Sequence, residues 1–151
     1  MLYPKHNERA EKTKRRQAQQ KARSEAVQDA VDRDGRCMAY CCSCRTDRGP
    51  FARKLDGHHI IPLSQGGPDV PENIITLCHQ YAHHAAHHGY SDPGRGGHVP
   101  AAVYMYETMA MLRDTCEWRW SEEAWQFTRL RRNQSIPLLS GPASCGHSRD
   151  E

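Results

Sequence analysis

The N-terminal part of the chain is strongly polar, and its apolar positions follow a helical rather than an alternating pattern. Residues 8–32 contain neither Pro nor Gly, and small alanines recur at intervals of four. This pattern predicts a long polar helix that ends at Gly35. Its only sizeable apolar side chains are Val27 and Val31. We therefore expect the C-terminal end of the helix to dock on the rest of the protein while the N-terminal part projects.

In the middle of the chain, apolar residues form short runs separated by turn residues. Leu55–Leu63 is the best candidate for a strand, and a Gly-Gly-Pro cluster after it predicts a turn and a loop. Ile74–Leu77 is a second short apolar run. Tyr81–His88 is predicted to form a helix that Gly89 stops. The expected order is strand, loop, strand and helix.

The last third of the chain predicts two more helices. Ser91–Gly97 is rich in Gly and is expected to be a flexible link. Pro100 and Ser121 are typical first residues of helices. Three large apolar residues share one face of the first of them: Met105, Met109 and Leu112. We expect both helices to pack on the core rather than to carry chemistry, and residues 136–151 to form a frayed tail.

Composition limits how this chain can be stabilised. Only 37% of the 151 residues are hydrophobic, which predicts a small core, yet the chain contains seven Cys and ten His. A bound metal can supply the stability that such a core lacks. Disulfides are the alternative. No apolar run is long enough for a signal peptide or a transmembrane helix, so we expect a cytoplasmic protein whose thiols bind metal, not a secreted disulfide-rich protein.

Charge is concentrated at the N-terminus. Residues 1–23 contain eight basic residues against two acidic ones, Glu8 and Glu11, and so carry a net charge of +6. Because the whole chain has a net charge of +3, the remainder carries −3. The basic residues are Lys5, Arg9, Lys12, Lys14, Arg15, Arg16, Lys21 and Arg23. A basic arm on a nearly neutral body favours a polyanionic partner, most commonly nucleic acid. The alternative is a solvated terminus without a partner.

The segment 58–88 contains residues suited to phosphodiester hydrolysis. His58 and His59 are adjacent, Asn73 follows fifteen residues after His58, and a His-rich helix ends the segment. This hydrolysis requires a divalent cation and a base that deprotonates water. Neutral imidazoles can bind the cation, and they can also act as the base. This order of residues resembles the HNH, or ββα-metal, family of nucleases.

The resemblance covers roughly residues 33–89 and implies an α+β fold. We expect a small zinc-stabilised ββα-metal core, flanked by the N-terminal basic helix and the C-terminal helices. The corresponding domain boundaries are an arm at 1–32, a nuclease core at 33–92, a helical extension at 98–133 and a flexible tail at 134–151.

The His-rich helix can serve two metal sites, because residues four apart share a helix face. Many HNH nucleases have a CxxC before the His pair and a second one after the Asn. This chain has the second motif only in part, because Tyr81 stands where its second Cys would fall. The resemblance therefore implies a structural zinc site with these ligands: Cys41, Cys44, Cys78 and His83. Cys37 and Cys42 are alternatives within the first pair, and the extra cysteines can also be small buried residues.

For the catalytic site, the resemblance implies that His58 is a metal ligand and that His59 is the general base. Asn73 is expected to bridge the loop and to hold the backbone that orients the base. The remaining ligands of the catalytic ion are expected at His84, at His88 or at both. The ion is a divalent metal (Mg, Mn, Ni or Zn), which the ligand types do not distinguish further.

The expected function is metal-dependent hydrolysis of phosphodiester bonds in DNA. Small stand-alone HNH proteins of this size resemble those of bacteriophages, which by analogy suggests phage packaging proteins as partners and the host cytoplasm as the location. The alternative is a noncatalytic zinc-stabilised nucleic-acid-binding module.

Overall fold

The computed structural model describes residues 5–40, 54–115 and 117–136, and these form an α+β fold. The helices in this part of the chain are α1 (Lys5–Asp34), α2 (Ala82–His88), α3 (Ala101–Asp114) and α4 (Glu122–Ser135). The strands are β1 (Leu55–His59), β2 (Ile74–Cys78), β3 (Tyr90–Asp92) and β4 (Gly97–Val99). They pair as two separate antiparallel hairpins, β1 with β2 and β3 with β4. The expected α+β class is confirmed.

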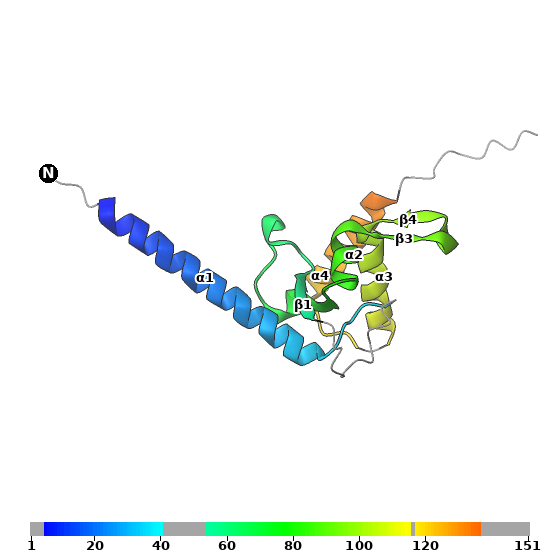
Figure 1. Ribbon diagram of the computed structural model, residues 1–151, viewed down its shortest axis with the longest axis horizontal. Helices are drawn as coiled ribbons and strands as arrows, with labels where there is room; N and C mark the ends of the chain where they lie inside the picture. Colours follow the sequence, from blue (N-terminus) through cyan, green and yellow to red (C-terminus); the bar gives the residue numbers. More distant parts are fainter. Residues whose placement is uncertain (1–4, 41–53, 116, 137–151) are drawn as a thin grey trace, which may run out of the picture.

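Helix α1 projects from the rest of the protein for most of its length (Figure 1). Residues 7–25 are exposed, whereas Ala26 and Ala30 are buried against Ile74 of β2. Gly57 of β1 allows this contact, since a Cβ there would lie 2.9 Å from both Val27 and Ile74. The prediction that the C-terminal end of the helix docks is thus confirmed. The helix ends as predicted at Gly35, which has a left-handed φ of 63°.

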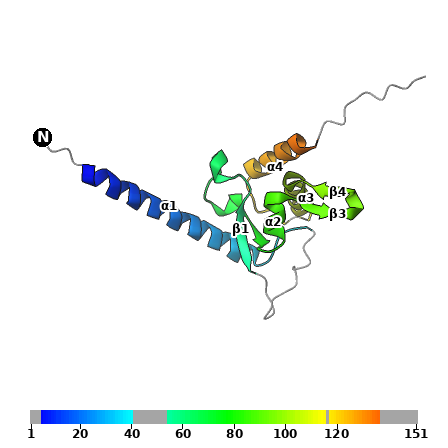
Figure 2. The same ribbon diagram turned by 45° about the horizontal axis from the view of Figure 1, so that its top comes forward.

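The β1–β2 hairpin and α2 follow one another in the ββα order (Figure 2). In the hairpin, His58 pairs with Ile75 and His59 with Ile74. The sequence predicted that the first strand extends to Leu63, but β1 already ends at His59. The chain turns away there because Pro62 begins a short 3-10 helix at Leu63–Gln65. Helix α2 packs on β2 and on α3.

The segment predicted to be a flexible link is a hairpin instead. Tyr90 pairs with Val99, and Asp92 pairs with Gly97 across a turn. The Tyr90 ring also lies edge-on to Tyr104 of α3, with ring centroids 5.6 Å apart. Each strand has only three residues, and an isolated hairpin of this size is at best marginally stable. Packing on α3 therefore supplies stability that the pairing of the two strands lacks.

Helices α3 and α4 cover the ββα unit, as predicted. Met105, Met109 and Leu112 of α3 are buried in the main core. Ser121 caps α4, because its side-chain oxygen accepts a hydrogen bond from the backbone N–H of Ala124. Within the described part of the chain, every helix is too short or too polar to cross a membrane.

Candidate metal centre and catalytic histidines

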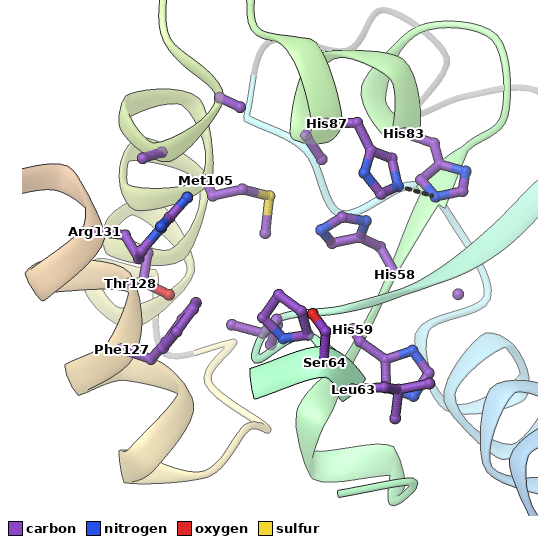
Figure 3. Close-up of a pocket in the computed structure, with 16 residues that line it drawn as sticks. His58, His59, Leu63, Ser64, His83, His87, Met105, Phe127, Thr128 and Arg131 are labelled. Carbon is purple, nitrogen blue, oxygen red and sulfur yellow. Dashed lines mark hydrogen bonds between the residues drawn. The ribbon is translucent and has the colours of Figure 1, made fainter. Parts of the chain in front are cut away.

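The structure brings together three histidines from two elements. His58 extends from β1, and His83 and His87 lie one turn apart on α2. One ring nitrogen of each falls in a group whose members all lie within 4.8 Å of one another. The ring centroid of His58 lies 5.4 Å from that of His83 and 4.8 Å from that of His87. Figure 3 shows the three rings facing one another.

The rotation of α2 about its axis determines which histidines meet His58. Ala82, Ala85 and Ala86 are buried in the core and fix the inward face of the helix. His83 and His87 flank this face on the side of β1, since each residue is rotated by about 100° from the one before. The group therefore depends on alanines that let the helix lie close to the hairpin.

Burial keeps His58 neutral. The side chain is 9% exposed, and desolvation together with the nearby rings of His87, His83 and His59 lowers its pKa to about 3. Burial and the neighbouring histidines, first among them His83, also lower the pKa of His87. Neutral imidazoles have a free lone pair, which is the form that binds metal.

The donor set fits a divalent transition-metal ion. The Nε2 atoms of His83 and His87 lie 3.1 Å apart. Imidazole nitrogens at about 2.0–2.1 Å from one ion lie roughly 3 to 3.5 Å from each other in tetrahedral or octahedral geometry. His58 is within reach of the same point, and three protein ligands leave positions open for water and substrate. This arrangement is typical of a catalytic rather than a structural metal site.

The opposite edge of the His83 ring faces Asp56. The Nδ1 atom of His83 lies 3.1 Å from Oδ2 of Asp56, and the same oxygen is in contact with Nδ1 of His79. Burial by itself raises the pKa of Asp56, but these hydrogen bonds and the Lys54 ammonium outweigh it and hold the pKa below its usual value. Asp56, His79 and His83 form a second group that could hold an ion, and it shares His83 with the first.

His59 points to the other face of β1, as expected for the next residue along a strand. Its Nε2 atom lies 2.9 Å from Oδ1 of Asp69. Arg23 of α1 donates a hydrogen bond to the same carboxylate, at 3.2 Å from Nε to Oδ1. Burial raises the pKa of Asp69, but the hydrogen bonds from Arg23 and His59 outweigh it and lower the pKa overall. An ionised Asp69 thus joins the basic helix to His59.

Asn73 is fully buried and connects the two ends of the loop between the strands. Its Oδ1 accepts a hydrogen bond from the backbone N–H of Ile61 at 2.9 Å, and its Nδ2 donates to the backbone oxygens of Ile61 and Pro68. Gly67 lies so close to this loop that a Cβ there would fall 1.9 Å from the Ile61 oxygen. Asn73 thereby fixes the backbone that follows His59.

His84 and His88 do not lie with His58. Their rings are 4.7 Å apart and line a separate surface hollow with His98, beside the β3–β4 hairpin. The triad of His58, His84 and His88 expected from the sequence is therefore not the one that the structure brings together. His83, which was expected at the structural zinc, lies with His58 instead.

Two of the expected zinc ligands, Cys41 and Cys44, lie outside the described residues, as does the alternative Cys42. Cys78 is buried beside Cys37, whose sulfur accepts a hydrogen bond from the backbone N–H of Cys78 at 3.3 Å. Burial raises the pKa of the Cys37 thiol. The structure therefore pairs Cys78 with the cysteine that the sequence offered as an alternative ligand.

Two carboxylates of the site were not among the predicted residues. Asp56 stands two positions before His58, so strand periodicity alone places both on one face of β1. That signal was available in the sequence. Asp69 was not predictable in this way, because it lies in the loop and meets His59 only through the fold.

A cavity of about 510 Å³ opens beside the metal group. Its lining includes His58, His59, His83 and His87 on one side and residues of α3 and α4 on the other (Figure 3). The histidines are thus accessible from a concave surface, as expected for residues that act on a substrate.

Comparison with known proteins agrees with this geometry. A family model described as HNH endonuclease matches residues 37–88, which contain both strands of the first hairpin and all of α2. Searches of curated proteins and of solved structures gave no match.

Proposed function

The chain is a member of the HNH endonuclease family through its domain at residues 37–88, and we propose that it is a metal-dependent DNA endonuclease. Family membership supports a nuclease-type function in general. The finer proposal depends on one observation, the convergence of His58, His83 and His87 beside His59. These residues combine a cation site with a base in one cavity.

We assign His58, His83 and His87 as the ligands of the catalytic ion. A divalent cation held there supplies Lewis-acid stabilisation of the phosphate charge and of the departing 3′ oxygen. The low pKa of His58 supports this assignment, because the ring does not have to lose a proton before it binds a cation at neutral pH. Imidazole ligands favour Mn, Ni or Zn over Mg.

We assign His59 as the general base. If Nε2 carries the proton that Asp69 accepts, Nδ1 keeps the lone pair that removes a proton from water. The water oxygen then forms a bond to phosphorus, and the bond from phosphorus to the 3′ oxygen breaks. The departing 3′ oxygen takes up a proton from solvent, and His59 releases to solvent the proton that it accepted. The products are a 5′-phosphate and a 3′-hydroxyl. Asn73 holds the loop after His59 and takes no part in the bond changes.

By analogy with phage-encoded members of the family, the substrate is phage DNA in the host cytoplasm, with packaging proteins as partners. The structural zinc remains part of the proposal, with Cys78 as one ligand and the others among Cys37, Cys41, Cys42 and Cys44.

Cleavage of supercoiled plasmid tests the function directly. The protein should convert it to nicked or linear DNA with Mn²⁺ or Ni²⁺ and not in a chelator. His59→Ala should reduce the rate by about 10²- to 10⁴-fold, the usual contribution of a positioned base, without loss of bound metal. Binding of plasmid without cleavage under every metal would instead indicate the noncatalytic module.

Matched variants on α2 test the ligand assignment. His83→Ala and His87→Ala should abolish cleavage and weaken binding of the activating ion. His84→Ala and His88→Ala are the controls, because they remove the same side chain from the same helix on the face away from His58. Loss of cleavage in the control variants alone would show that His84 and His88, and not His83 and His87, bind the catalytic ion.

A further inference from the structure

The wall of the cavity opposite the histidines is formed by residues of α3 and α4. Phe127, Thr128 and Arg131 extend from α4 toward the cavity, and Met105 of α3 lies beside them (Figure 3). Phe127 and Arg131 are four residues apart and so share one helix face. The two sides of the cavity therefore differ: one holds the metal group, and the other combines an apolar surface with one cation.

Arg131 differs from the other basic residues of α4. Arg132 lies over the ring of Tyr106, with its guanidinium carbon 4.6 Å from the centroid, and Arg129 donates a hydrogen bond to Gln126. The Arg131 guanidinium has no hydrogen bond or ion pair with any described residue. An exposed arginine without a partner at the mouth of a cavity is available for an anion.

Phe127 is also without an aromatic partner. Trp118 lies edge-on to Trp120 and Trp125, and Trp125 stacks on Tyr106. The half-buried Phe127 ring, in contrast, makes no ring contact within the described part of the chain. Its surroundings in the cavity include the thioether of Met105. A flat apolar ligand can stack on this ring without displacing a side chain that already does so.

We propose that this wall binds one unpaired nucleotide of the DNA strand next to the phosphate that is cut. The base stacks on Phe127, and Arg131 pairs with a phosphate of the same strand. The proposal rests on the proposed function, since it takes DNA as the ligand. Among nucleic-acid groups, a nucleotide unites the flat apolar face and the negative charge that the two side chains require. A cavity of about 510 Å³ is of the size that holds a ligand of this kind.

The state of the base decides which DNA is preferred. Stacking of a base on an aromatic side chain strengthens binding roughly 5- to 150-fold. Extraction of a paired base from a duplex costs a similar or larger factor, whereas a mismatched, bulged or single-stranded base is already unstacked. Stacking on one phenylalanine therefore does not offset the free energy of extracting a base from a fully paired site. We expect a preference for DNA with an unpaired nucleotide at the cut.

Equilibrium binding tests this preference independently of cleavage. The His59→Ala protein with Mn²⁺ is titrated against two labelled duplexes, one fully paired and one with a single central bulged nucleotide, and anisotropy gives both dissociation constants. The bulged duplex should bind at least about tenfold more tightly. Phe127→Leu keeps an apolar side chain but removes the stacking surface, and it should bring the ratio of the constants to within about threefold. Equal binding of the two duplexes, or an unchanged ratio in Phe127→Leu, overturns the proposal.

Two variants separate the arginine from general charge. Arg131→Gln should weaken binding of the bulged duplex and reduce the slope of log affinity against log salt by about one. Arg129→Gln removes the same charge from α4 outside the cavity lining and should leave the ratio of the two constants unchanged. A larger effect of Arg129→Gln than of Arg131→Gln on binding of the bulged duplex contradicts the proposed contact.

Cleavage of the same duplexes by the protein without the His59 substitution distinguishes the two proposals. If both duplexes are cut at equal rates and bound equally, the endonuclease function stands and the nucleotide pocket fails. If neither is cut but the bulged duplex binds more tightly in a manner that depends on Phe127, the pocket stands and the endonuclease function fails.

Discussion

The Nδ1 atom of His83 lies 3.1 Å from Oδ2 of Asp56, on the edge of the ring opposite to the nitrogen that faces His87. A carboxylate in this position accepts the Nδ1 proton. The lone pair is then left on Nε2, where the metal group converges. The contact thus fixes both the tautomer and the direction of one proposed ligand.

Removal of this carboxylate should weaken metal binding without removing a ligand of the catalytic ion. Asp56→Ala should reduce the affinity for Zn²⁺ or Ni²⁺ by about 10- to 100-fold, as is usual for the outer partner of a metal-binding histidine. Calorimetry measures the affinity and the stoichiometry. Lys54→Ala is the control, because Lys54 pairs only loosely with Asp56, at 3.7 Å, and is 75% exposed.

The stoichiometry also reports on the second group of Asp56, His79 and His83. If Asp56 serves as an acceptor for His83, the wild type binds one ion at the histidine group, and His79→Ala leaves that number unchanged. Loss of one equivalent of ion in His79→Ala would instead make Asp56 and His79 ligands of a separate site.

How far the sequence determines the site is clearest on α2. The spacing of four predicts two histidine pairs on two faces, and this is correct. The faces differ by about 100°, and both flank the buried alanines. Which flank meets His58 depends on where β1 lies relative to α2, which is a long-range relation that no local pattern contains. The family spacing suggested His84 and His88, whereas packing places His83 and His87 beside His58.

The strands give a similar lesson. The ββα order, the docking end of α1 and both C-terminal helices followed from periodicity and from turn residues. The β3–β4 hairpin did not, because its three-residue strands carry almost no signal of their own and depend on Tyr104 for packing. Predictions from local pattern therefore hold where an element has its own periodic face, and they fail where a neighbour stabilises it.

The hydrogen bond between His59 and Asp69 predicts an effect on turnover. Asp69→Ala removes the acceptor that orients the ring and selects its tautomer, so kcat should fall by roughly tenfold or more, while KM and the metal content stay close to wild type. Asp69→Asn, which keeps an acceptor oxygen, should recover part of this loss. A change confined to KM would show that Asp69 contributes to DNA binding and not to the base.

Arg23→Gln tests the outer link of the same chain of contacts. Arg23 is 47% exposed and holds Asp69 from α1, so its removal should lower kcat less than Asp69→Ala does. An effect larger than that of Asp69→Ala would indicate that Arg23 acts on DNA directly.

The depressed pKa of His58 predicts that the metal-free protein loses stability in mild acid. Below about pH 6.5 the unfolded chain takes up a proton at this position, whereas the folded protein does not until about pH 3. The free energy of unfolding should therefore fall as the pH is lowered through this window, by up to about 1.4 kcal/mol per pH unit for one proton. Above pH 6.5 the group contributes no pH dependence.

Urea denaturation in a chelator at several pH values between 7 and 4.5 measures this slope. His58→Gln should show a shallower dependence, because the group that titrates differently in the two states is gone. His84→Gln serves as the control on the exposed face of α2. Equal slopes in wild type and His58→Gln would contradict the assignment of the buried neutral ring.

The exposed part of α1 predicts a salt-dependent contribution to DNA binding. Deletion of residues 1–22 removes the projecting arm and keeps Arg23, which contacts Asp69. Residues 1–22 carry seven basic side chains against two acidic ones, a net charge of +5. Each phosphate that the arm neutralises adds about 0.9 to the slope of log affinity against log salt, so truncation should flatten the slope by several units.

The affinity of the truncated protein should fall alike for all DNA sequences, because phosphate contacts do not read bases. The rate on saturating DNA should persist, since the histidine group and Asp69 remain. An unchanged salt slope would mean that the helix is a solvated extension, and it would shift the main binding surface to the cavity and to Arg131.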